Sequence, residues 1–354
     1  MEPTSRQKPR RATIEDVAAA ASVSVATVSR ALRGLPNVAP STRARVGEAA
    51  TGLNHQPDPA ASRLAAGATT TLLVMVPSTS SWYFAQVIAG AEAVAAETSH
   101  DFLAIGVRSL EQRDRLLDEA YRLERRADGV PMVNIGATDD QATSLRRRGI
   151  GLATIGTRAP GCPAVQVDDE AVGHLAAEHL AGLGHRRLGV IGGSLDDPLS
   201  FDVPVLRRRG FAAGLAARGV AFDPELHVAG NFNVDGGREA MARLLDAPDP
   251  PTAVFAMSDE MAFGGLMELS DRTLRPGVDV SLMGVDDHEF ARVVSLTSIR
   301  QQVELQGALA IRALLAAIAG LRGGQAPLTD APIRSPIELV SRSSTRDGPF
   351  RPVG

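Results

Sequence analysis

The sequence predicts a small all-α head joined by a short linker to a larger α/β body with two lobes. Two short amphipathic segments, 14–21 and 25–32, separated by a tight turn, predict the head. After Thr71 the pattern changes, because continuous apolar runs alternate with amphipathic stretches. This alternation is typical of parallel sheets covered by helices. There are too many such units for one small sheet, so we expect two α/β lobes with a cleft between them.

The composition of the chain fits a globular protein with more than one domain. At 354 residues, of which 44% are hydrophobic, two or three units with sizeable cores are expected. The formal net charge of −4 alone argues against a nucleic-acid partner, but the charge is uneven. Residues 1–67 carry nine Lys and Arg against five Asp and Glu, a net of +4, whereas the remainder carries 28 against 36, a net of −8. A basic head on an acidic body predicts phosphate contacts at one end only.

Several other functions are disfavoured by the sequence. The single cysteine, Cys162, excludes an internal disulfide and a cysteine-based metal site. No apolar run approaches a membrane span, and the N-terminus lacks the apolar core of a signal peptide, so we expect a cytoplasmic protein without a membrane partner. His174 and His179 do not share a helical face, and no phosphate-binding loop with a lysine is present. We therefore expect no enzyme activity, no metal and no cofactor.

The expected organisation has five parts. They are a disordered basic tail (1–11), a helix-turn-helix domain (12–56), a hinge helix or linker (57–68), a two-lobed domain (69–345) and a second tail (346–354). The first lobe is expected at about 69–168 plus 300–328, and the second at about 169–298 plus 329–345. Prolines at 57 and 59 separate the head from the linker, because a residue that precedes proline avoids the helical conformation.

The individual elements follow from apolar periodicity and from turn residues. The head is expected to hold helices at 14–21, 25–32 and 41–50. Strands of the body are expected at 72–76, 102–107, 129–135, 152–155, 188–191, near 226–229, 253–257 and 280–285. Helices of the body are expected at 84–97, 111–126, 139–148, 170–183, 205–218, 235–246, 259–270 and 303–321.

The second helix of the head carries side chains suited to reading DNA. Ser24 precedes it, where the hydroxyl can cap free N–H groups. The exposed side of its first two turns is expected to carry Val25, Ala26, Ser29 and Arg30. Arginine can bind guanine O6 and N7 together, small apolar side chains contact thymine methyl groups, and the hydroxyls of Thr27 and Ser29 suit phosphates. The spacing predicts a helix-turn-helix that reads the major groove, although any short helical bundle exposes some Ser, Thr and Arg.

Several motifs resemble the lactose-repressor (LacI/GalR) family of bacterial transcriptional regulators. They are Thr13-Ile-Glu-Asp-Val-Ala, Val23-Ser-Val-Ala-Thr-Val-Ser-Arg30, Asn37-Val38, Thr42-Arg43, and Pro57 followed by Ala61-Ser-Arg-Leu64. The resemblance covers nearly the whole chain. It implies a periplasmic-binding-protein-like sensor and a homodimer whose two heads bind the half-sites of a pseudo-palindromic operator in double-stranded DNA. The segment 342–354 lacks an apolar heptad, so we expect a dimer and not a coiled-coil tetramer.

The resemblance also gives the linker a role. In the family a leucine of each hinge helix wedges into the central minor-groove step, and Leu64 is the matching residue; a wedge of this kind kinks the duplex. The alternative for Leu64 is ordinary packing against the sensor. The predicted DNA-contacting residues are Thr13, Ser24, Val25, Ala26, Thr27, Ser29, Arg30, Arg33, Asn37, Arg63 and Leu64.

Three positions of the head depart from the family pattern. Ala39 stands where a serine usually caps the third helix, although Ser41 can partly substitute. Asp58 stands where asparagine is common, and a carboxylate near phosphate is unfavourable unless it is paired, for example by Arg63. His55 replaces a usual tyrosine. These departures leave the DNA-binding prediction in place but predict an altered operator affinity or sequence.

The cleft is expected to bind a small molecule beyond the carboxyl ends of the strands. After the run 72–76 come Trp82, Tyr83 and Phe84, whose aromatic faces can stack on a sugar or a base. The alternative for each of them is a place in the core. Ser258 follows the run 253–257. These residues are predicted to line the cleft.

Further cleft residues are implied by the resemblance. Arg207 matches the family arginine that precedes a Gly-aromatic pair, Asp286 matches the cleft aspartate, and Phe232 matches a stacking aromatic; Phe201 can add another face. An aspartate and an arginine across a cleft suit a polyhydroxylated ligand. Gly156 stands where the family often has an aspartate, so one hydroxyl acceptor is missing.

Together these features predict a ligand-responsive DNA-binding regulator, in particular a repressor of sugar or related carbon-source genes, acting with the nucleoid in the cytoplasm. Two alternatives stay open. One is control by a non-sugar metabolite or by a protein partner, and the other is action as an activator. A pure solute-binding protein is disfavoured by the basic head.

Overall fold

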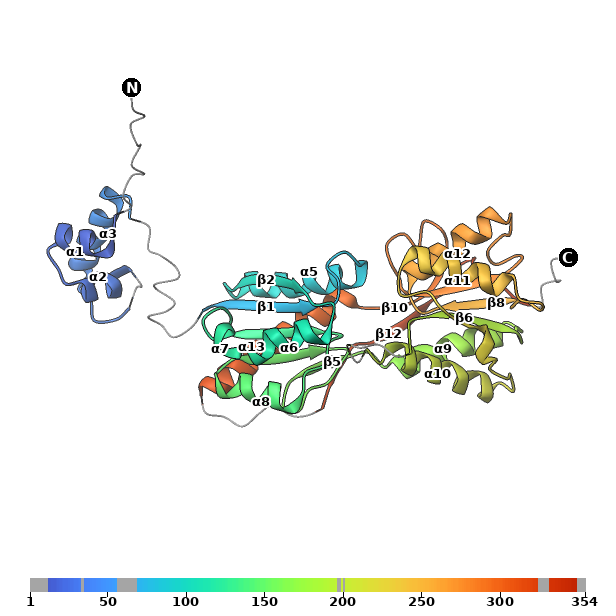
Figure 1. Cartoon of the computed structure of the whole chain (residues 1–354). Coiled ribbons are helices and arrows are strands. Elements are labelled where there is room, and N and C mark those ends of the chain that lie inside the picture. Colours follow the sequence, from blue (N-terminus) through green and yellow to red (C-terminus); the bar gives the residue numbers. More distant parts are fainter. Residues whose placement is uncertain are drawn as a thin grey trace, which may run out of the picture. The chain divides into compact units, whose positions relative to one another are not determined.

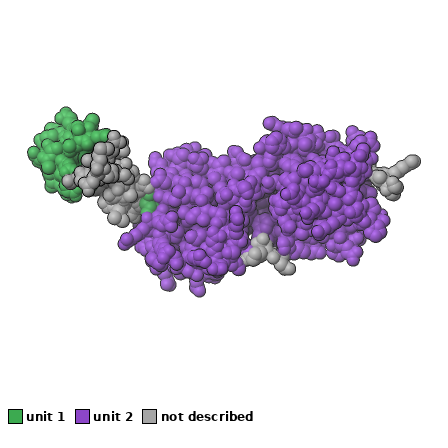
Figure 2. Space-filling model, turned by 45° about the horizontal axis from the view of Figure 1, so that its top comes forward, with its two compact units in different colours: residues 1–69 green, residues 70–354 purple. Residues whose placement is uncertain are grey.

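The computed structural model describes residues 12–32, 35–55, 69–195, 199, 201–323 and 331–348. The chain divides into two compact units, residues 1–69 and residues 70–354, which Figure 2 colours green and purple. Each unit has a hydrophobic core of its own. The boundary between these units lies close to the predicted boundary between the linker and the two-lobed domain.

The first unit contains three helices, α1 (Ile14–Ala21), α2 (Val25–Leu32) and α3 (Pro40–Gly52). The first two have the predicted bounds, and α3 begins one residue earlier and ends two residues later than predicted. A capping box starts α1, because the Thr13 hydroxyl accepts from the Asp16 N–H while the Asp16 carboxylate accepts from the Thr13 N–H. Ser22 ends α1 in the left-handed conformation, with φ of 51°, which starts the tight turn into α2.

The core of the head consists of small and β-branched side chains from all three helices. It is formed by Val17, Ala18, Ala21, Val28, Ala31, Val46 and Ala50. Because these residues recur at helical spacing, each helix buries one stripe and leaves the opposite side to solvent. The outer side of α2 is thereby held rigidly on the surface of the head.

The first lobe of the second unit is built on a parallel six-stranded sheet with the order β11-β5-β4-β3-β1-β2. Its strands are β1 (Thr71–Val76), β2 (Asp101–Gly106), β3 (Gly129–Val133), β4 (Gly151–Ile155), β5 (Ala164–Gln166) and β11 (Ile333–Arg334). Its helices are α5 (Trp82–Glu97), α6 (Leu110–Asp118), α7 (Ala120–Leu123), α8 (Asp139–Arg147) and α13 (Val303–Arg322). Figure 1 shows α13, near the C-terminus, among the elements of this lobe.

The second lobe is built on a mixed sheet with the order β12-β10-β9-β8-β6-β7. Its strands are β6 (Leu188–Gly192), β7 (His227–Ala229), β8 (Ala253–Ala256), β9 (Ser281–Asp286), β10 (Thr297–Gln301) and β12 (Ile337–Val340). Its helices are α9 (Asp169–Gly182), α10 (Val203–Ala217), the short 3₁₀ turn η1 (Pro224–Leu226), α11 (Val234–Leu245) and α12 (Asp259–Asp271).

The structure corrects the sequence prediction in four places. The strands β5, β10, β11 and β12 were not predicted. The helix predicted at 111–126 is two helices, α6 and α7. The second sheet is not wholly parallel, because β12 pairs antiparallel with β10. Finally, β11 pairs with β5 in the first sheet, so the chain returns to the second lobe after Arg334 and not near residue 329.

Helix α13 also qualifies the expectation of no membrane span. Among the described residues it is one helix that is long and apolar enough to cross a membrane, by length and composition only. Its buried residues, which include Ile311, Leu314 and Ile318, pack against α5 and against the sheet of the first lobe. This packing accounts for its apolar character.

Candidate functional site

The outer face of α2 is the first candidate site. Val25 is 40% exposed, and Ala26 and Arg30 are also exposed. The Ser24 hydroxyl accepts from the Thr27 N–H at 3.2 Å, so it caps α2 as predicted. Small apolar groups and one guanidinium therefore lie together on the solvent side of a capped helix.

The other predicted DNA-contacting residues of the head are less available for contact with DNA. Thr27 and Ser29 are half-buried, Asn37 is exposed with φ of 70°, and the Thr13 hydroxyl is engaged in the capping box of α1. Arg33, Arg63 and Leu64 lie outside the described residues, as do the predicted hinge helix, the N-terminal tail and residues 349–354 of the C-terminal tail.

Two of the departures from the family pattern are visible in the head. Ala39 occupies the N-cap of α3 and provides no side-chain hydrogen bond, so the cap is missing as predicted. The His55 ring lies beside Ala12, with Nδ1 2.8 Å from the Ala12 carbonyl oxygen. His55 thus links the end of α3 to the start of the head.

The second candidate site is a cavity of about 210 Å³ between the two lobes of the second unit. Both lobes contribute to its wall. Its lining residues include Tyr83, Phe84, Asn134, Gly156, Asp169, Phe201, Arg207, Phe232, Ser258, Glu260, Asp286, Gln301 and Gln306. Of the eight predicted effector residues, all but Trp82 are in this set.

Two pairs of aromatic rings belong to opposite lobes. Tyr83 and Phe84, on the first turn of α5, meet edge to face at a centroid distance of 5.3 Å. Phe201 and Phe232 meet in the same way, also at 5.3 Å, in the second lobe. A cavity with aromatic side chains in both lobes suits a ligand with a flat or apolar face.

A buried ion pair lies at the second-lobe side of the cavity. Arg207 Nε donates to Asp169 Oδ1 at 2.8 Å, and its Nη1 donates to the Met257 carbonyl. Both side chains are nearly inaccessible, at 5% and 6%. Burial raises the pKa of Asp169, and the guanidinium opposes that rise. Arg207 therefore lies in the cavity wall, as predicted, but its charge already has a partner that the sequence analysis did not identify.

Asp286 lies in the cavity wall at the end of a chain of amides. Gln301 Nε2 donates to Asp286 Oδ1 at 2.5 Å, and Gln306 Nε2 donates to Gln301 Oε1 at 3.2 Å. The Tyr83 hydroxyl donates to Gln306 Oε1 at 3.0 Å and completes the chain. Burial raises the pKa of Asp286 to about 7, while Arg207 and the Gln301 hydrogen bond oppose the rise. The Asp286 carboxyl group therefore titrates near neutral pH, which makes it a candidate functional group of the cavity.

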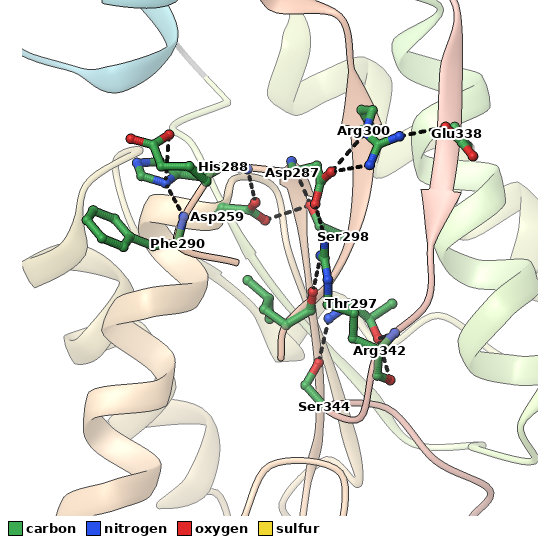
Figure 3. Close-up of polar contacts among 12 residues, drawn as sticks. Asp259, Asp287, His288, Phe290, Thr297, Ser298, Arg300, Glu338, Arg342 and Ser344 are labelled. Atoms are coloured by element: carbon green, nitrogen blue, oxygen red, sulfur yellow. Dashed lines mark hydrogen bonds and ion pairs between the residues drawn. The ribbon is translucent and has the colours of Figure 1, made fainter. Parts of the chain in front are cut away.

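Hydrogen bonds and ion pairs hold the loop that follows β9, as Figure 3 shows. Asp259 accepts from the His288 N–H at 2.8 Å and from the Ser298 hydroxyl at 2.8 Å. Burial raises the pKa of Asp259, and the neighbouring Asp286 raises it further. Asp287 is paired with Arg300 at 2.7 Å and with Arg342. Asp287 therefore has a structural role, whereas its neighbour Asp286 lines the cavity.

The missing acceptor at Gly156 has a geometric explanation. Gly156 has φ of 80°, and a Cβ built on it would collide with Asn134 Oδ1. Asn134 is 5% exposed, lines the cavity and makes no side-chain hydrogen bond with any described residue. An amide therefore lies where a side chain on Gly156 would have to go. It can both donate and accept, which a carboxylate cannot.

Two predicted residues have other contacts. Trp82 does not line the cavity: its indole N–H donates to Glu289 Oε2 at 2.7 Å. Ser258 lines the cavity and also caps α12 by accepting from the Met261 N–H. Arg208, the neighbour of Arg207, is half-buried and lies over the Phe222 ring at 5.4 Å.

Within the described ranges no group of three or more His, Cys, Asp or Glu side chains could hold a metal ion. Asn134, Asp169, Glu260, Gln301 and Gln306 line the cavity but were not predicted as site residues. Two features of the sequence could have pointed to these residues. Gly156, which leaves room for another side chain, could have pointed to Asn134, and the paired aspartates at 168–169 could have pointed to Asp169.

Comparison with known proteins shows the family of the chain. Residues 13–58 match the family of bacterial regulatory proteins named for LacI, and residues 177–345 match a periplasmic binding protein-like domain. Catabolite control protein A of Priestia megaterium is 32% identical over 307 residues, which is 85% of this chain and 91% of that protein. The chain belongs to the LacI family. It is accordingly a DNA-binding transcriptional regulator and not an enzyme, and it acts in the cytoplasm.

Solved structures of LacI-family proteins share its fold. A complex of the transcriptional regulator CelR with cellobiose aligns with a TM-score of 0.67 and 30% identity, over 94% of this chain and 100% of that one. The Lac repressor dimer bound to operator and the anti-inducer ONPF aligns with a TM-score of 0.80 and 25% identity, over 95% and 100%. The predicted fold, a helix-turn-helix head with a two-lobed sensor, is confirmed.

Proposed function

We propose that the protein is a dimeric repressor whose operator affinity is controlled by a small molecule bound in the cavity between its lobes. The observation that carries the proposal is the cavity between the lobes, lined by polar and aromatic side chains, in a chain whose head exposes Val25, Ala26 and Arg30. The head supplies sequence recognition and the cavity supplies control. Binding to DNA places the protein with the nucleoid.

The operator contacts are proposed to centre on α2. Arg30 reads guanine in the major groove, Val25 and Ala26 contact thymine methyl groups, and the remaining predicted polar residues of the head position it on phosphates. Arg63 and Leu64 complete the set in the linker, where Leu64 wedges into the central minor-groove step. Two heads in a dimer make the site a pseudo-palindrome.

The effector is proposed to be a sugar or a sugar derivative. Asp286 accepts from its hydroxyl groups, and Asn134 both donates and accepts. Arg207 donates through the hydrogens that neither Asp169 nor the Met257 carbonyl uses. The aromatic rings of both lobes cover its apolar faces. The cellobiose complex of CelR supports this class, because that protein shares the fold over nearly its whole length.

A second candidate effector is a non-sugar metabolite with a planar ring. The observation that favours it is the pair of aromatic residues in each lobe, Tyr83 with Phe84 and Phe201 with Phe232. Gly156 also deprives the cavity of one carboxylate that would accept from a hydroxyl group.

Control follows from linkage between the two sites. An effector that prefers one relative orientation of the lobes shifts the protein toward that orientation and thereby changes the geometry of the paired linkers. Operator and effector then alter each other's affinity by the same factor, typically about 1–3 kcal/mol.

The effector half of the proposal is tested by binding measurements with a panel of neutral mono- and disaccharides and nucleosides. Isothermal titration is expected to find a ligand that binds the wild type and not Asp286→Asn. Arg218→Ala removes an exposed arginine paired with Glu178 outside the cavity and is the matched control. A ligand that binds the Asp286→Asn variant as well as the wild type would exclude the cavity as its site.

A further inference from the structure

We propose that Trp82 is a positioning residue that links the first lobe to the loop following Asp286. Closure of the cleft and the orientation of the Asp286 side chain are thereby coupled. The proposal rests on the proposed function, in which the cavity holds the effector. It assigns Trp82 to the regulation of the site and not to contact with the effector.

The first observation is the contact that Trp82 makes across the cleft. Trp82 begins α5 in the first lobe, whereas His288 and Glu289 follow β9 in the second. The indole N–H donates to Glu289 Oε2 at 2.7 Å, and the indole ring lies on the His288 ring at 4.6 Å with an angle of 31°. One side chain thus makes a hydrogen bond and a stacking contact with the opposite lobe.

The second observation is that the His288 ring is already supported by the second lobe. Phe263 of α12 meets it edge to face at 5.2 Å, and Phe290 stacks on it at 5.3 Å and 20°. The Phe290 N–H also donates to His288 Nδ1 at 3.0 Å (Figure 3). The imidazole therefore offers Trp82 a fixed surface. A fixed partner makes an aromatic contact more favourable, because less side-chain freedom is lost when it forms.

The third observation joins this surface to the cavity. Asp286 has φ of 118° and Asp287 has φ of 53°, so two consecutive non-glycine residues adopt unfavourable conformations. Two hydrogen bonds hold them: Asp259 accepts from the His288 N–H, and Ser298 accepts from the Asp287 N–H at 3.0 Å. A backbone constrained in this way has few alternatives, so the position of His288 and the direction of the Asp286 side chain, two residues away, are set together.

The first turn of α5 makes three different contacts in succession. The Ser81 hydroxyl donates to Glu260 Oε2 at 2.9 Å in the second lobe, and Glu260 lines the cavity. Trp82 contacts the Asp286 loop, and Tyr83 faces the cavity and donates to Gln306. Closure of the cleft therefore brings the loop and Glu260 against the start of α5 together, beside the cavity residue Tyr83.

The other explanation for Trp82 is that it covers apolar surface of its own lobe, since it also packs against the core of that lobe. A covering role requires neither the hydrogen bond to Glu289 nor any sensitivity to the cavity. The two explanations therefore differ in what happens to the indole when a cavity residue that does not touch it is changed.

The test uses the fact that Trp82 is the only tryptophan in the chain. Acrylamide quenching of its fluorescence is measured on the full-length protein without DNA or effector. Glu289→Ala and His288→Ala are expected to raise the quenching constant, because the indole loses its partner in the second lobe. Glu289→Gln, which keeps an acceptor oxygen, is expected to restore the wild-type value. Glu178→Ala, a change at a comparably exposed carboxylate of the same lobe, is the control and is expected to have no effect.

A second pair of variants separates positioning from covering. Gln301→Ala removes the donor to Asp286 and does not touch Trp82, so it raises the quenching constant only if the loop links the cavity to the indole. Gln112→Ala removes a glutamine that bonds to Gly106 outside the cavity and should leave quenching unchanged. An unchanged constant in Glu289→Ala, or in Gln301→Ala while Glu289→Ala responds, would overturn the proposal. Neither measurement uses DNA or an effector, so failure here is distinct from failure of the proposed function.

Discussion

Asp286 is the residue at which the chemistry of the cavity can be tested most simply. Its pKa rises with burial to about 7, well above the ordinary value of 3.8. A carboxyl group whose pKa is raised on folding contributes stability that is present below its unfolded pKa. That stability is lost as the pH rises through the folded pKa.

We therefore predict that the wild type loses stability relative to Asp286→Asn between about pH 4 and pH 7. Urea unfolding of both proteins at pH 5 and at pH 8 measures this difference. The advantage of the variant should be larger at pH 8, where the wild type carries the buried charge. An equal difference at both pH values would mean that Asp286 is ionised throughout and is not desolvated.

The sequence predicted which residues lie near the cavity better than it predicted which way their side chains point. Arg207 and Asp286 lie in the cavity wall as their motifs suggested, because both follow from their places on α10 and β9. Trp82 could not be separated from Tyr83 and Phe84, since three consecutive aromatic residues at a strand end are equivalent in sequence. Their directions depend on where the first turn of α5 points, which only the packed lobe determines.

Helices α5 and α13 are held together by close backbone contact. A Cβ on Gly307 would collide with the Val87 carbonyl oxygen, and one on Gly90 would collide with the Glu304 carbonyl oxygen. We predict that Gly307→Ala destabilises the sensor, because two helix backbones must move apart, at a cost of about 1–3 kcal/mol. Gly47→Ala on α3, where nothing lies within 4 Å, is the control and should stabilise its helix by about 1 kcal/mol. Calorimetry measures the unfolding temperature of both variants. Equal changes in stability would show that α5 and α13 can move apart without cost.

The missing cap of α3 gives a second prediction for an element. Ala39 sits at the N-cap with extended backbone angles, φ −57° and ψ 141°, and no side-chain hydrogen bond. Ala39→Ser should stabilise α3 by about 1 kcal/mol, because a serine hydroxyl can accept from the first free N–H groups. Hydrogen exchange of the α3 amides should slow in the variant. Exchange that is no slower would mean that another group already caps this helix.

The predictability of an element depended on its length and on its burial pattern. Long helices and continuous apolar strands were placed within a few residues, because periodicity and flanking turn residues mark them. β5 and β11 are only three and two residues long, and both residues of β11 are exposed, so neither strand leaves an apolar pattern. The break between α6 and α7 lies at Glu119, where no glycine or proline marks the end of a helix in the sequence.

At the scale of the whole molecule, the second lobe exposes several large apolar side chains on α12 and the loop after β9. They are Met267, Phe290, Val293 and Val294, with Val293 71% exposed. Large apolar side chains that are exposed to solvent are typical of interfaces, so they support the proposed dimer. We predict that Val293→Asp weakens dimerisation without loss of fold, measured as a lower molar mass by light scattering at equal concentration. Val25→Asp on the head is the control and should leave the molar mass unchanged.

The central claim is that this chain reads a specific operator through α2. Footprinting of the purified protein on the DNA of its own organism, with and without a metabolite extract, tests it most directly. We predict protection of a pseudo-palindromic site that Arg30→Ala weakens by about 1–3 kcal/mol, with the loss concentrated at guanine positions, and that Arg218→Ala leaves unchanged. Protection without sequence preference, or equal protection by Arg30→Ala, would contradict the account.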